Sequence, residues 1–294
     1  MTATLSVNIA SALDPAMAEI FLDGAIRLGD MGFASWMRVR PGATKTIEKT
    51  SINPPGAYSP KVAGADFAFS ALTAAYDKTY TQAEHAIAFE VASLADHFLD
   101  RTAKGEFISQ IGASAARKFA TDAYNVLANG FADVGPDGQS LFATTHPAQV
   151  GGNQSNTGTT AFGEAGLKAA LIVQRRLKTP DNILAESRAT HLVVPPDTEF
   201  DAHELLRSTL SGSDMQDNAL RGLGLQVVVA PELTDASDWF LIDASQFRSY
   251  MYVGKGTSPK DWIDMESDAY KVSDRLIYAV GYDGWRGAFG ASVA

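Results

Sequence analysis

The sequence contains no cysteine, which excludes disulfide frameworks, zinc–thiolate sites and cysteine nucleophiles. No window approaches the roughly 18 consecutive apolar residues of a membrane-spanning helix. Residues 1–8 lack the basic start and apolar run of a secretory signal peptide. The chain also has no dense basic run, and its net charge is −10. Because proteins that grip nucleic acid normally carry a basic face, we expect no tight binding of phosphate over a large surface.

Residue patterns that support catalysis are also missing. No two of the five histidines stand at H-x-x-x-H metal spacing: His85, His97, His146, His191 and His203. We interpret His146, which precedes Pro147, as a loop histidine whose ring caps a backbone group. Ser114 lies in a helical pattern without the second glycine of a nucleophile elbow. Gly222-Leu223-Gly224 precedes a strand and lacks the third glycine of a dinucleotide fingerprint.

Two groups of carboxylates remain as candidates: Asp235, Asp238 and Asp243, and Asp261, Asp264 and Glu266. We interpret the first group as solvated loop residues. For the second group a divalent-ion site is an alternative, and we favour a solvated acidic face. The sequence therefore predicts no catalytic, cofactor-binding or metal-binding residues, and no enzyme.

The longest regular pattern is an amphipathic helix from Thr102 to Asn129. Its apolar residues recur at spacings of three and four: Ile108, Ile111, Ala115, Phe119, Ala123 and Val126. At 1.5 Å per residue this helix would be about 40 Å long, which suggests a spine with other elements laid across it. Gly130 stands where a helix-capping glycine belongs. A short polar and apolar signature follows, from Asp137 to Pro147.

Before the spine, the period changes to two between Trp36 and Phe89, which predicts a β ribbon. Tyr76, Lys78 and Tyr80 would share one face of it, and neither face is properly apolar. Such a ribbon cannot form a core by itself, so it is either stabilised by another copy of the protein or a mobile surface hairpin. His85–Leu99 has helical spacing and predicts a short helix that leads into the spine.

After the signature, the pattern becomes α/β. We expect helices over 162–177 and 199–210, and strands over 191–194, 223–230 and 239–242, with an edge strand over 247–253.

A long strand follows over 270–282, with one largely apolar face. We expect Phe107, Ile111, Phe119 and Val126 of the spine helix to face it.

This order of elements resembles the major capsid proteins of tailed bacteriophages, which have the Hong Kong 97-type fold. More closely, it resembles the Mu-like major head subunit family. The resemblance spans Trp36–Phe289, and it rests on seven segments: Val91–Leu99, Ile111–Arg117, Asn129–Phe131, Asp137–Phe142 with His146-Pro147, Leu192–Pro196, Val227–Leu233 and Trp239–Asp243. The D-G-x-x-L-F-x-x-x-H-P run is the most specific of these segments.

The resemblance implies an α+β chain of five parts. These are an N-terminal arm over 1–35, an E-loop hairpin over 36–89, a peripheral domain with the spine helix over 90–145, an axial domain over 146–260, and peripheral-domain strands over 261–294. Within the axial domain we expect the tip at Ser211–Arg221, a polar loop with a glycine between a helix and a strand, and the Thr234–Asp238 turn is the alternative. There Asp214 and Asp217 would form rings of like charge around the capsomer axis.

The resemblance also implies a function and partners. Copies would assemble as hexamers and pentamers into an icosahedral shell that holds double-stranded DNA, in the virion, after assembly in the bacterial host cytoplasm. Portal and scaffolding proteins would be further partners, with decoration proteins as an open case and no membrane. The absence of cysteine suits a reducing compartment, and an acidic inner face would let DNA slide.

Two alternatives are an encapsulin-like compartment shell and, further off, a hydrolase or transferase on the α/β region over 163–253. Some members of the fold crosslink subunits through a lysine. Nothing marks Lys45, Lys49, Lys61 or Lys78 as reactive, so we predict no crosslink. We also expect scaffolding to come from a separate protein and not from the N-terminal arm.

Overall fold

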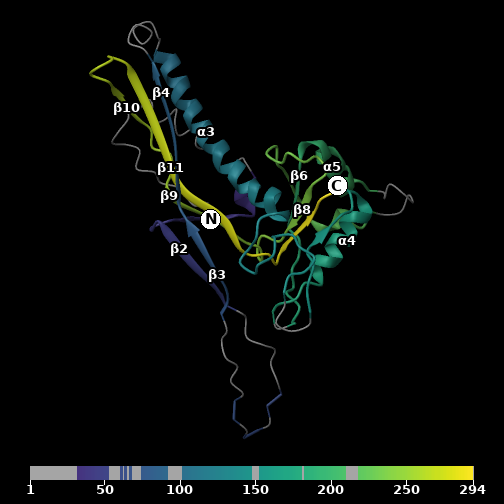
Figure 1. The fold of residues 1–294 in the computed structure, drawn as a ribbon. Coiled ribbons are helices and arrows are strands. Elements are labelled where there is room, and N and C mark those ends of the chain that lie inside the picture. Colours follow the sequence, from purple (N-terminus) through teal and green to yellow (C-terminus); the bar gives the residue numbers. More distant parts are fainter. Residues whose placement is uncertain are drawn as a thin grey trace.

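The computed structural model describes residues 32–52, 60–61, 63–64, 66–67, 74–91, 101–147, 152–180, 182–209 and 218–293. It is a mixed α/β chain with two five-stranded sheets and a separate two-stranded ribbon. The long helix α3 (Arg101–Ala128) runs along the first sheet, and two shorter helices belong with the second sheet (Figure 1). His97 and most of the loop over 211–221, where we expected the axial tip, lie outside the described residues.

The first sheet, called here the long sheet, is built around β11 (Tyr270–Gly284). Its other strands are β1 (Arg38–Pro41), β4 (Ala83–Val91), β9 (Arg248–Lys255) and β10 (Lys260–Ile263). The strand β11 pairs antiparallel with β4, β9 and β10, while β1 pairs parallel with β9. Segments far apart in the sequence therefore meet along one strand.

Helix α3 packs on β11 through its apolar face, as the spacing predicts. Ile111 and Phe119 are buried, and the Phe119 ring lies 4.6 Å from the ring of Tyr278 on β11. The Tyr278 hydroxyl donates a hydrogen bond to Asp122 Oδ2 at 2.6 Å. The prediction for Phe119 is confirmed, and the helix bounds agree with the expected ones to within one residue. The side chain of Phe107 lies outside the described residues.

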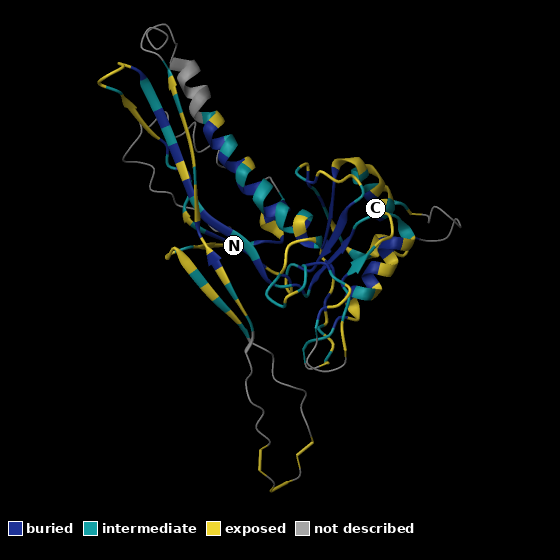
Figure 2. Cartoon of the chain, in the orientation of Figure 1, coloured by how far each residue is buried: buried dark blue, intermediate teal, exposed yellow. Residues whose placement is uncertain are grey.

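The second sheet, called here the body sheet, has the strand order β5-β12-β8-β6-β7. These strands are β5 (Thr157–Gly158), β12 (Ala288–Ala291), β8 (Trp239–Ile242), β6 (His191–Val194) and β7 (Gln226–Val229). Every residue of β6, β8 and β12 is buried, which Figure 2 shows as a dark blue centre. The apolar runs Leu192–Val194 of β6 and Trp239–Ile242 of β8 fit strands covered on both faces.

Two helices accompany the body sheet. They are α4 (Glu164–Arg175) and α5 (Glu199–Arg207), as their spacing predicts. Of the short 3-10 turns, η4 (Pro196–Thr198) and η5 (Arg221–Leu223) contact α5, while η2 (Phe33–Ser35) and η3 (Asn129–Phe131) contact α3. On α4, Leu167, Ala170 and Leu171 point inward, in a cluster that includes Trp239 and Phe289.

Two expectations from the sequence are wrong. His85–Val91 is part of strand β4 rather than a helix, because it pairs with β11 from Val91 opposite Tyr270 to Ala83 opposite Tyr278. Pairing along that strand decides the conformation of a short apolar run whose helical spacing is weak. The expected edge strand over 247–253 is the internal strand β9, held between β1 and β11 of the long sheet.

The ribbon consists of β2 (Thr46–Ile52) and β3 (Ala74–Thr81). Strands β1 and β4, which fall inside the expected range 36–89, belong to the long sheet instead. Ile47, Lys49 and Ser51 lie opposite Tyr80, Lys78 and Tyr76. These three cross-strand pairs share one face, and that face is turned toward the ends of β9 and β11. The opposite face is exposed, with Glu48, Asp77 and Thr79 on it.

Candidate functional site

The signature loop forms a buried polar cluster between the two sheets. The His146 ring is fully buried, and its Nδ1 lies 2.6 Å from Asp137 Oδ2. Its Nε2 lies 3.0 Å from Asn156 Oδ1. The ring also stacks on Trp285, with centroids 4.0 Å apart and an interplanar angle of 11°. The ring thus contacts side chains on three segments, so our interpretation of it as a cap on a backbone group is wrong.

Asn156 fixes the direction of hydrogen bonding in this cluster. Its Nδ2 donates to the carbonyl oxygens of Leu141, at 2.8 Å, and Ala288, at 3.1 Å. Its Oδ1 therefore points away from those carbonyls and accepts from the backbone N–H of Ala143. Both ring nitrogens of His146 then face oxygen atoms, the carboxylate of Asp137 on one side and the amide of Asn156 on the other, and the tautomer decides which nitrogen donates. These hydrogen bonds connect the signature loop to β12 and hold the loop in one conformation, so the cluster has a structural role.

A second feature is the contact between the ribbon and the ends of β9 and β11, called here the ribbon base. Tyr80 is 2% exposed, and its ring lies 5.1 Å from Tyr252 and 6.4 Å from Tyr250. Burial raises the pKa of the Tyr80 hydroxyl far above its ordinary value, and the nearby Asp283 carboxylate adds to this effect. At the junction with β4, Gln82 donates from Nε2 to the Thr44 carbonyl at 2.7 Å. Its side chain also fills the space beside Gly42 and Gly254.

Lysines and arginines from four parts of the chain gather at the ribbon base. Arg38, Arg40 and Lys49 lie over the Tyr250 ring at 5.8, 5.9 and 5.7 Å, and Lys78 lies over Tyr282 at 5.8 Å. Arg248 donates to Ser51 Oγ at 3.0 Å. Among the described residues, none of these cations has a carboxylate oxygen within 4.0 Å. A chain of net charge −10 therefore presents a cationic surface here.

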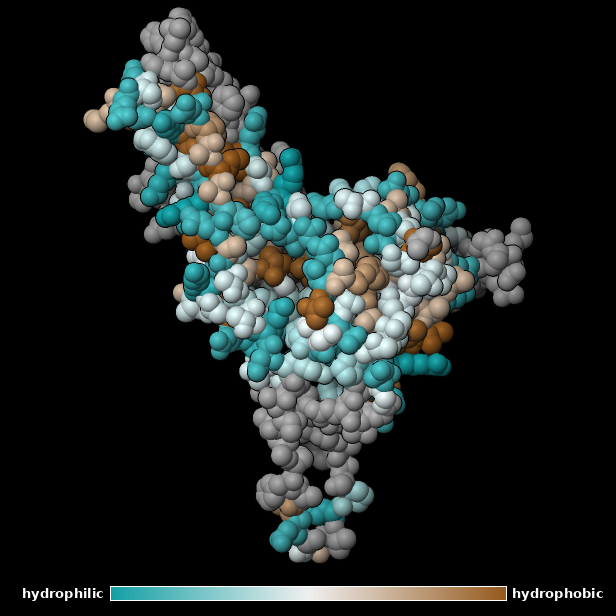
Figure 3. All heavy atoms as spheres, viewed as in Figure 1, coloured by the Kyte–Doolittle hydropathy of each residue, from teal (hydrophilic) through white to brown (hydrophobic). Residues whose placement is uncertain are grey.

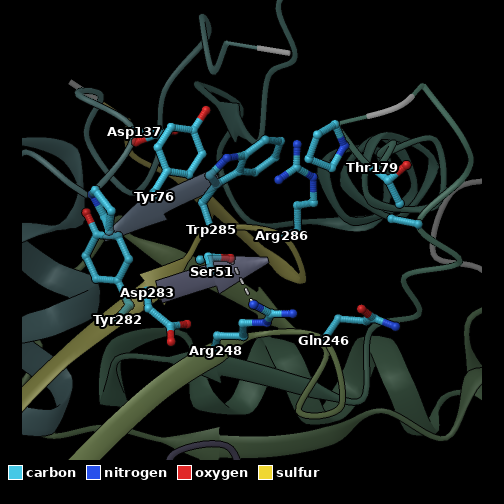
Figure 4. A pocket seen from close by; sticks show the side chains of 14 residues that line it. Ser51, Tyr76, Asp137, Thr179, Gln246, Arg248, Tyr282, Asp283, Trp285 and Arg286 are labelled. Carbon is cyan, nitrogen blue, oxygen red and sulfur yellow. Dashed lines mark hydrogen bonds between the residues drawn. The ribbon is translucent and has the colours of Figure 1, made fainter. Parts of the chain in front are cut away.

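A cavity of about 130 Å³ opens beside this surface (Figure 4). The opposed ribbon residues Ser51 and Tyr76 line it, together with Arg248 at the start of β9 and the segment Tyr282–Arg286 at the end of β11. In the figure Arg248 reaches toward Ser51, while Arg286 lies next to Trp285. The cavity thus joins the ribbon to the signature cluster, since Asp137 also lines it.

The other histidines that we weighed are separated in the fold. The His85 ring packs on Tyr278, with centroids 4.9 Å apart. His191 is buried on β6, its Nδ1 lies 2.8 Å from Thr190 Oγ1, and burial lowers its pKa. His203 lies on α5, and Ser114 lies inside α3. No group of three or more metal-binding side chains comes together in the described part of the chain.

The carboxylate predictions hold only in part. Asp235 is exposed and bonds Ser237, whose hydroxyl and N–H lower its pKa. Asp238 and Asp243 are buried at 7% and 2% exposure, so our interpretation of them as solvated is wrong. Burial raises the pKa of Asp238. Asp243 accepts from the backbone N–H of Arg188 at 2.7 Å and from the N–H of Ser245 at 3.0 Å, which explains its burial.

The acidic cluster near the last strand is a solvated face, as we favoured. Asp264 forms an ion pair with Lys271 at 2.6 Å and accepts from Ser267, and these bonds lower its pKa. Asp261 accepts from the Tyr270 hydroxyl at 3.2 Å, and Glu266 is exposed.

Two residues that matter most at the ribbon base could not be identified from the sequence. Asp283 lies near the end of β11, Arg286 lies in the short turn that follows, and neither stands in a recognisable motif. A usable signal existed in the Tyr282-Asp283 pair, because a carboxylate at the end of a largely apolar strand needs a partner. No helix among the described residues is long and apolar enough to cross a membrane.

Comparison with known proteins matches the chain to a family and to a fold. A family model described as phage capsid protein matches residues 78–291. The mature capsid protein of bacteriophage PhiM1 is similar, with a TM-score of 0.60 and 12% identity, over 89% of this chain and 86% of that chain. The capsid of Myoviridae phage XM1 has a TM-score of 0.57 and 12% identity, over 90% and 92%.

A virus-like particle from Pyrococcus furiosus has a TM-score of 0.58 and 10% identity, over 94% of this chain and 98% of that chain. At these identities the likeness shows the fold alone. No curated protein sequence matches the chain.

Proposed function

The chain belongs to the phage capsid protein family, and from this we propose that its copies assemble as hexamers and pentamers into an icosahedral shell around double-stranded DNA. The family match over residues 78–291 is the observation that carries the proposal. Membership makes the chain a capsid shell protein that works as an oligomer in the virion. A structural role of this kind indicates a non-enzymatic protein.

We place the chain in the Hong Kong 97-type fold, in a group resembling the Mu-like major head subunits. The long helix on a long sheet, the projecting ribbon and the separate body sheet support this assignment. The proposed parts are an arm over 1–35, an E-loop over 36–89, peripheral segments over 90–145 and 261–294, and an axial domain over 146–260. Strands β1 and β4 of the E-loop range and β9 of the axial range lie in the long sheet, beside the peripheral strand β11. Strand β12 would then join the axial sheet from the last segment, as its pairing with β8 suggests.

Further partners follow from the proposed shell. Portal and scaffolding proteins, and decoration proteins in some particles, would bind it during assembly in the bacterial cytoplasm. The net charge of −10 supports weak contact with packaged DNA, because few lysine–phosphate contacts can form.

The test is to express the chain and to image the product by electron microscopy. We expect closed shells with five-fold and quasi-six-fold capsomers. A protein that sediments as a monomer at all concentrations, with and without a scaffolding protein from the same genome, would contradict the proposal.

A second candidate function is an encapsulin-like compartment, a shell that holds proteins instead of DNA. The similarity of the fold to a virus-like particle from Pyrococcus furiosus supports this alternative. Particles from the native host separate the two cases. Nuclease-protected DNA of uniform length supports the phage capsid, and a protein cargo without DNA supports the compartment.

A further inference from the structure

The cavity at the ribbon base is lined by chemically mismatched groups. It lies where one cross-strand pair of the ribbon, Ser51 and Tyr76, meets the start of β9 and the end of β11. The wall from the ribbon is polar, and the wall from the strand ends carries two arginines and a buried carboxylate. Hydrogen-bond donors and an acceptor of this site therefore lack partners within the described part of the chain.

The two arginines are the donors of the site. Arg286 is half-buried, its Nε donates to the Lys178 carbonyl at 2.7 Å, and its guanidinium lies 4.5 Å from the centre of the Trp285 ring. Its terminal nitrogens have no hydrogen-bond or ion-pair partner within the described residues. Burial lowers the pKa of Arg286. Arg248 is exposed, and among the described residues its guanidinium donates only to the Ser51 hydroxyl. Both cations therefore have donors free for an anionic group.

Asp283 is the acceptor of the site. It is 8% exposed, and its buried Oδ1 has no hydrogen-bond partner among the described residues. A buried carboxylate oxygen without a donor is destabilising, because it has lost its bonds to water and gained none in exchange. Since Asp283 lines the same cavity as Arg248 and Arg286, the occupant must donate as well as accept.

We propose that this cavity is a socket for an acidic segment of a second copy of this chain. The side-chain carboxylate of that segment would bind Arg248 and Arg286, and its backbone N–H groups would donate to Asp283. A phosphate backbone fits less well, because it has no N–H donor and would meet the Asp283 carboxylate directly. The proposal deepens the capsid assignment and rests on it, since it names one contact through which copies assemble.

Charge complementarity supports a second copy as the occupant. The six cations of the ribbon base are Arg38, Arg40, Lys49, Lys78, Arg248 and Arg286. The other 18 lysines and arginines of the chain face 34 aspartates and glutamates. Outside these six cations, another copy therefore carries a net charge of −16. Lys49 and Lys78 lie directly opposite each other in the ribbon, and like charges in that position are destabilising until an anion approaches.

Zero-length crosslinking tests the socket. Arg248→Lys places an amine at the rim, and a carbodiimide joins an amine only to a carboxylate in contact with it. Chains labelled with heavy and light nitrogen are mixed before assembly, so that mass spectrometry separates links between copies from links within one copy. Arg207→Lys is the matched control, because Arg207 is exposed at the end of α5, away from the cavity.

We expect mixed-isotope links from position 248 to an aspartate or glutamate of another copy, at least ten times more abundant than from position 207. Links from position 248 to carboxylates of the same copy alone, or no links at all, would overturn the socket. If shells form without the mixed link, the capsid assignment is supported and the socket is contradicted. If the mixed link forms in small oligomers that never become shells, the socket is supported and the capsid assignment is contradicted.

Arg248→Gln supplies an independent measurement. We expect its self-association constant to fall at least ten-fold relative to Arg207→Gln, with a weaker dependence on salt. Duplex DNA serves as a probe for the other class of partner. If Arg248→Gln weakens binding of duplex DNA and leaves self-association unchanged, the surface binds nucleic acid and the proposal is wrong.

Discussion

Helix α3 and the ribbon are both long elements that extend from the rest of the chain, yet they are held in opposite ways (Figures 1 and 2). Helix α3 buries an apolar stripe on β11. The ribbon buries one tyrosine, Tyr80, while its other side chains are half-buried or exposed wherever the structure describes them. The difference teaches that projection alone does not mark an interface. The inner face of the ribbon carries two lysines and a serine beside its one tyrosine cluster, and these polar groups have contacts still to make.

The hydropathy of the surface is consistent with contacts that are mainly polar. Figure 3 shows that much of the described surface on this side of the molecule is hydrophilic or near neutral. A ribbon of this kind gains specificity from charged and polar contacts more than from buried apolar area. The following predictions either break or sharpen the contrast between the packed helix and the polar ribbon.

The largest effect should come from the packed side. Phe119→Ala removes a ring that is 4% exposed and lies against Tyr278, so it should lower the free energy of unfolding by about 3–5 kcal/mol. Urea unfolding measures this. Phe200→Ala is the control, because Phe200 is 80% exposed on α5 and should cost less than about 0.5 kcal/mol. Equal losses for the two variants would show that α3 is not packed as described.

The signature cluster should be the next most sensitive. Asp137→Asn keeps the shape but removes the charged acceptor 2.6 Å from the buried His146 ring. Hydrogen bonds to charged groups contribute about 1.5–3 kcal/mol, and we expect a loss of that size in urea unfolding. Asp77→Asn on the exposed face of the ribbon should change stability by less than about 0.5 kcal/mol. An unchanged Asp137→Asn would mean that the cluster does not lock the loop.

Much of the fold could be predicted from local patterns. Helix α3 and strands β6 and β8 were placed to within one residue, because their apolar periodicity extends over the whole element. Strand β4 was misread because its short pattern fits both periods, and pairing with β11 decided it. A local pattern cannot show such a pairing.

The site could be predicted far less well than the fold. Asn156 bonds the Ala288 carbonyl across 132 positions, and Arg248 bonds Ser51 across 197. Such contacts join segments that no local spacing relates. His146 was noticed in the sequence, but its burial depends on Trp285 and Asn156, which the fold brings to it.

A smaller effect should come from the tyrosine that holds the ribbon. The Tyr80 hydroxyl is buried without a hydrogen-bond partner among the described residues. Tyr80→Phe should therefore leave stability unchanged or raise it by up to about 1 kcal/mol. Tyr278→Phe is the matched control, since its hydroxyl bonds Asp122 at 2.6 Å, and it should cost about 1.5–3 kcal/mol. If Tyr80→Phe melts at a lower temperature than the natural chain, the Tyr80 hydroxyl has a hydrogen-bond partner.

The smallest effect on folding should come from Asp283→Asn. This variant should fold slightly more stably than the natural chain but self-associate more weakly. Burial raises the pKa of Asp283, although Arg248, Lys49 and Arg38 oppose this. The folded protein therefore keeps this proton to higher pH than the unfolded chain does, and the group's contribution to stability is lost as pH rises through its folded pKa.

Replacing Asp283 with asparagine removes that loss. The variant should be slightly more stable than the natural chain at pH 7, and the difference should vanish in acid, where both states are protonated. Self-association should nevertheless weaken, because asparagine offers the N–H groups of the docked segment one amide oxygen in place of a carboxylate. Urea unfolding at pH 7 and pH 3, with sedimentation at pH 7 on the same proteins, measures both signs. A variant that is less stable at pH 7 and assembles normally would show that Asp283 already has a donor within its own chain, and the ribbon base would then be as self-sufficient as helix α3.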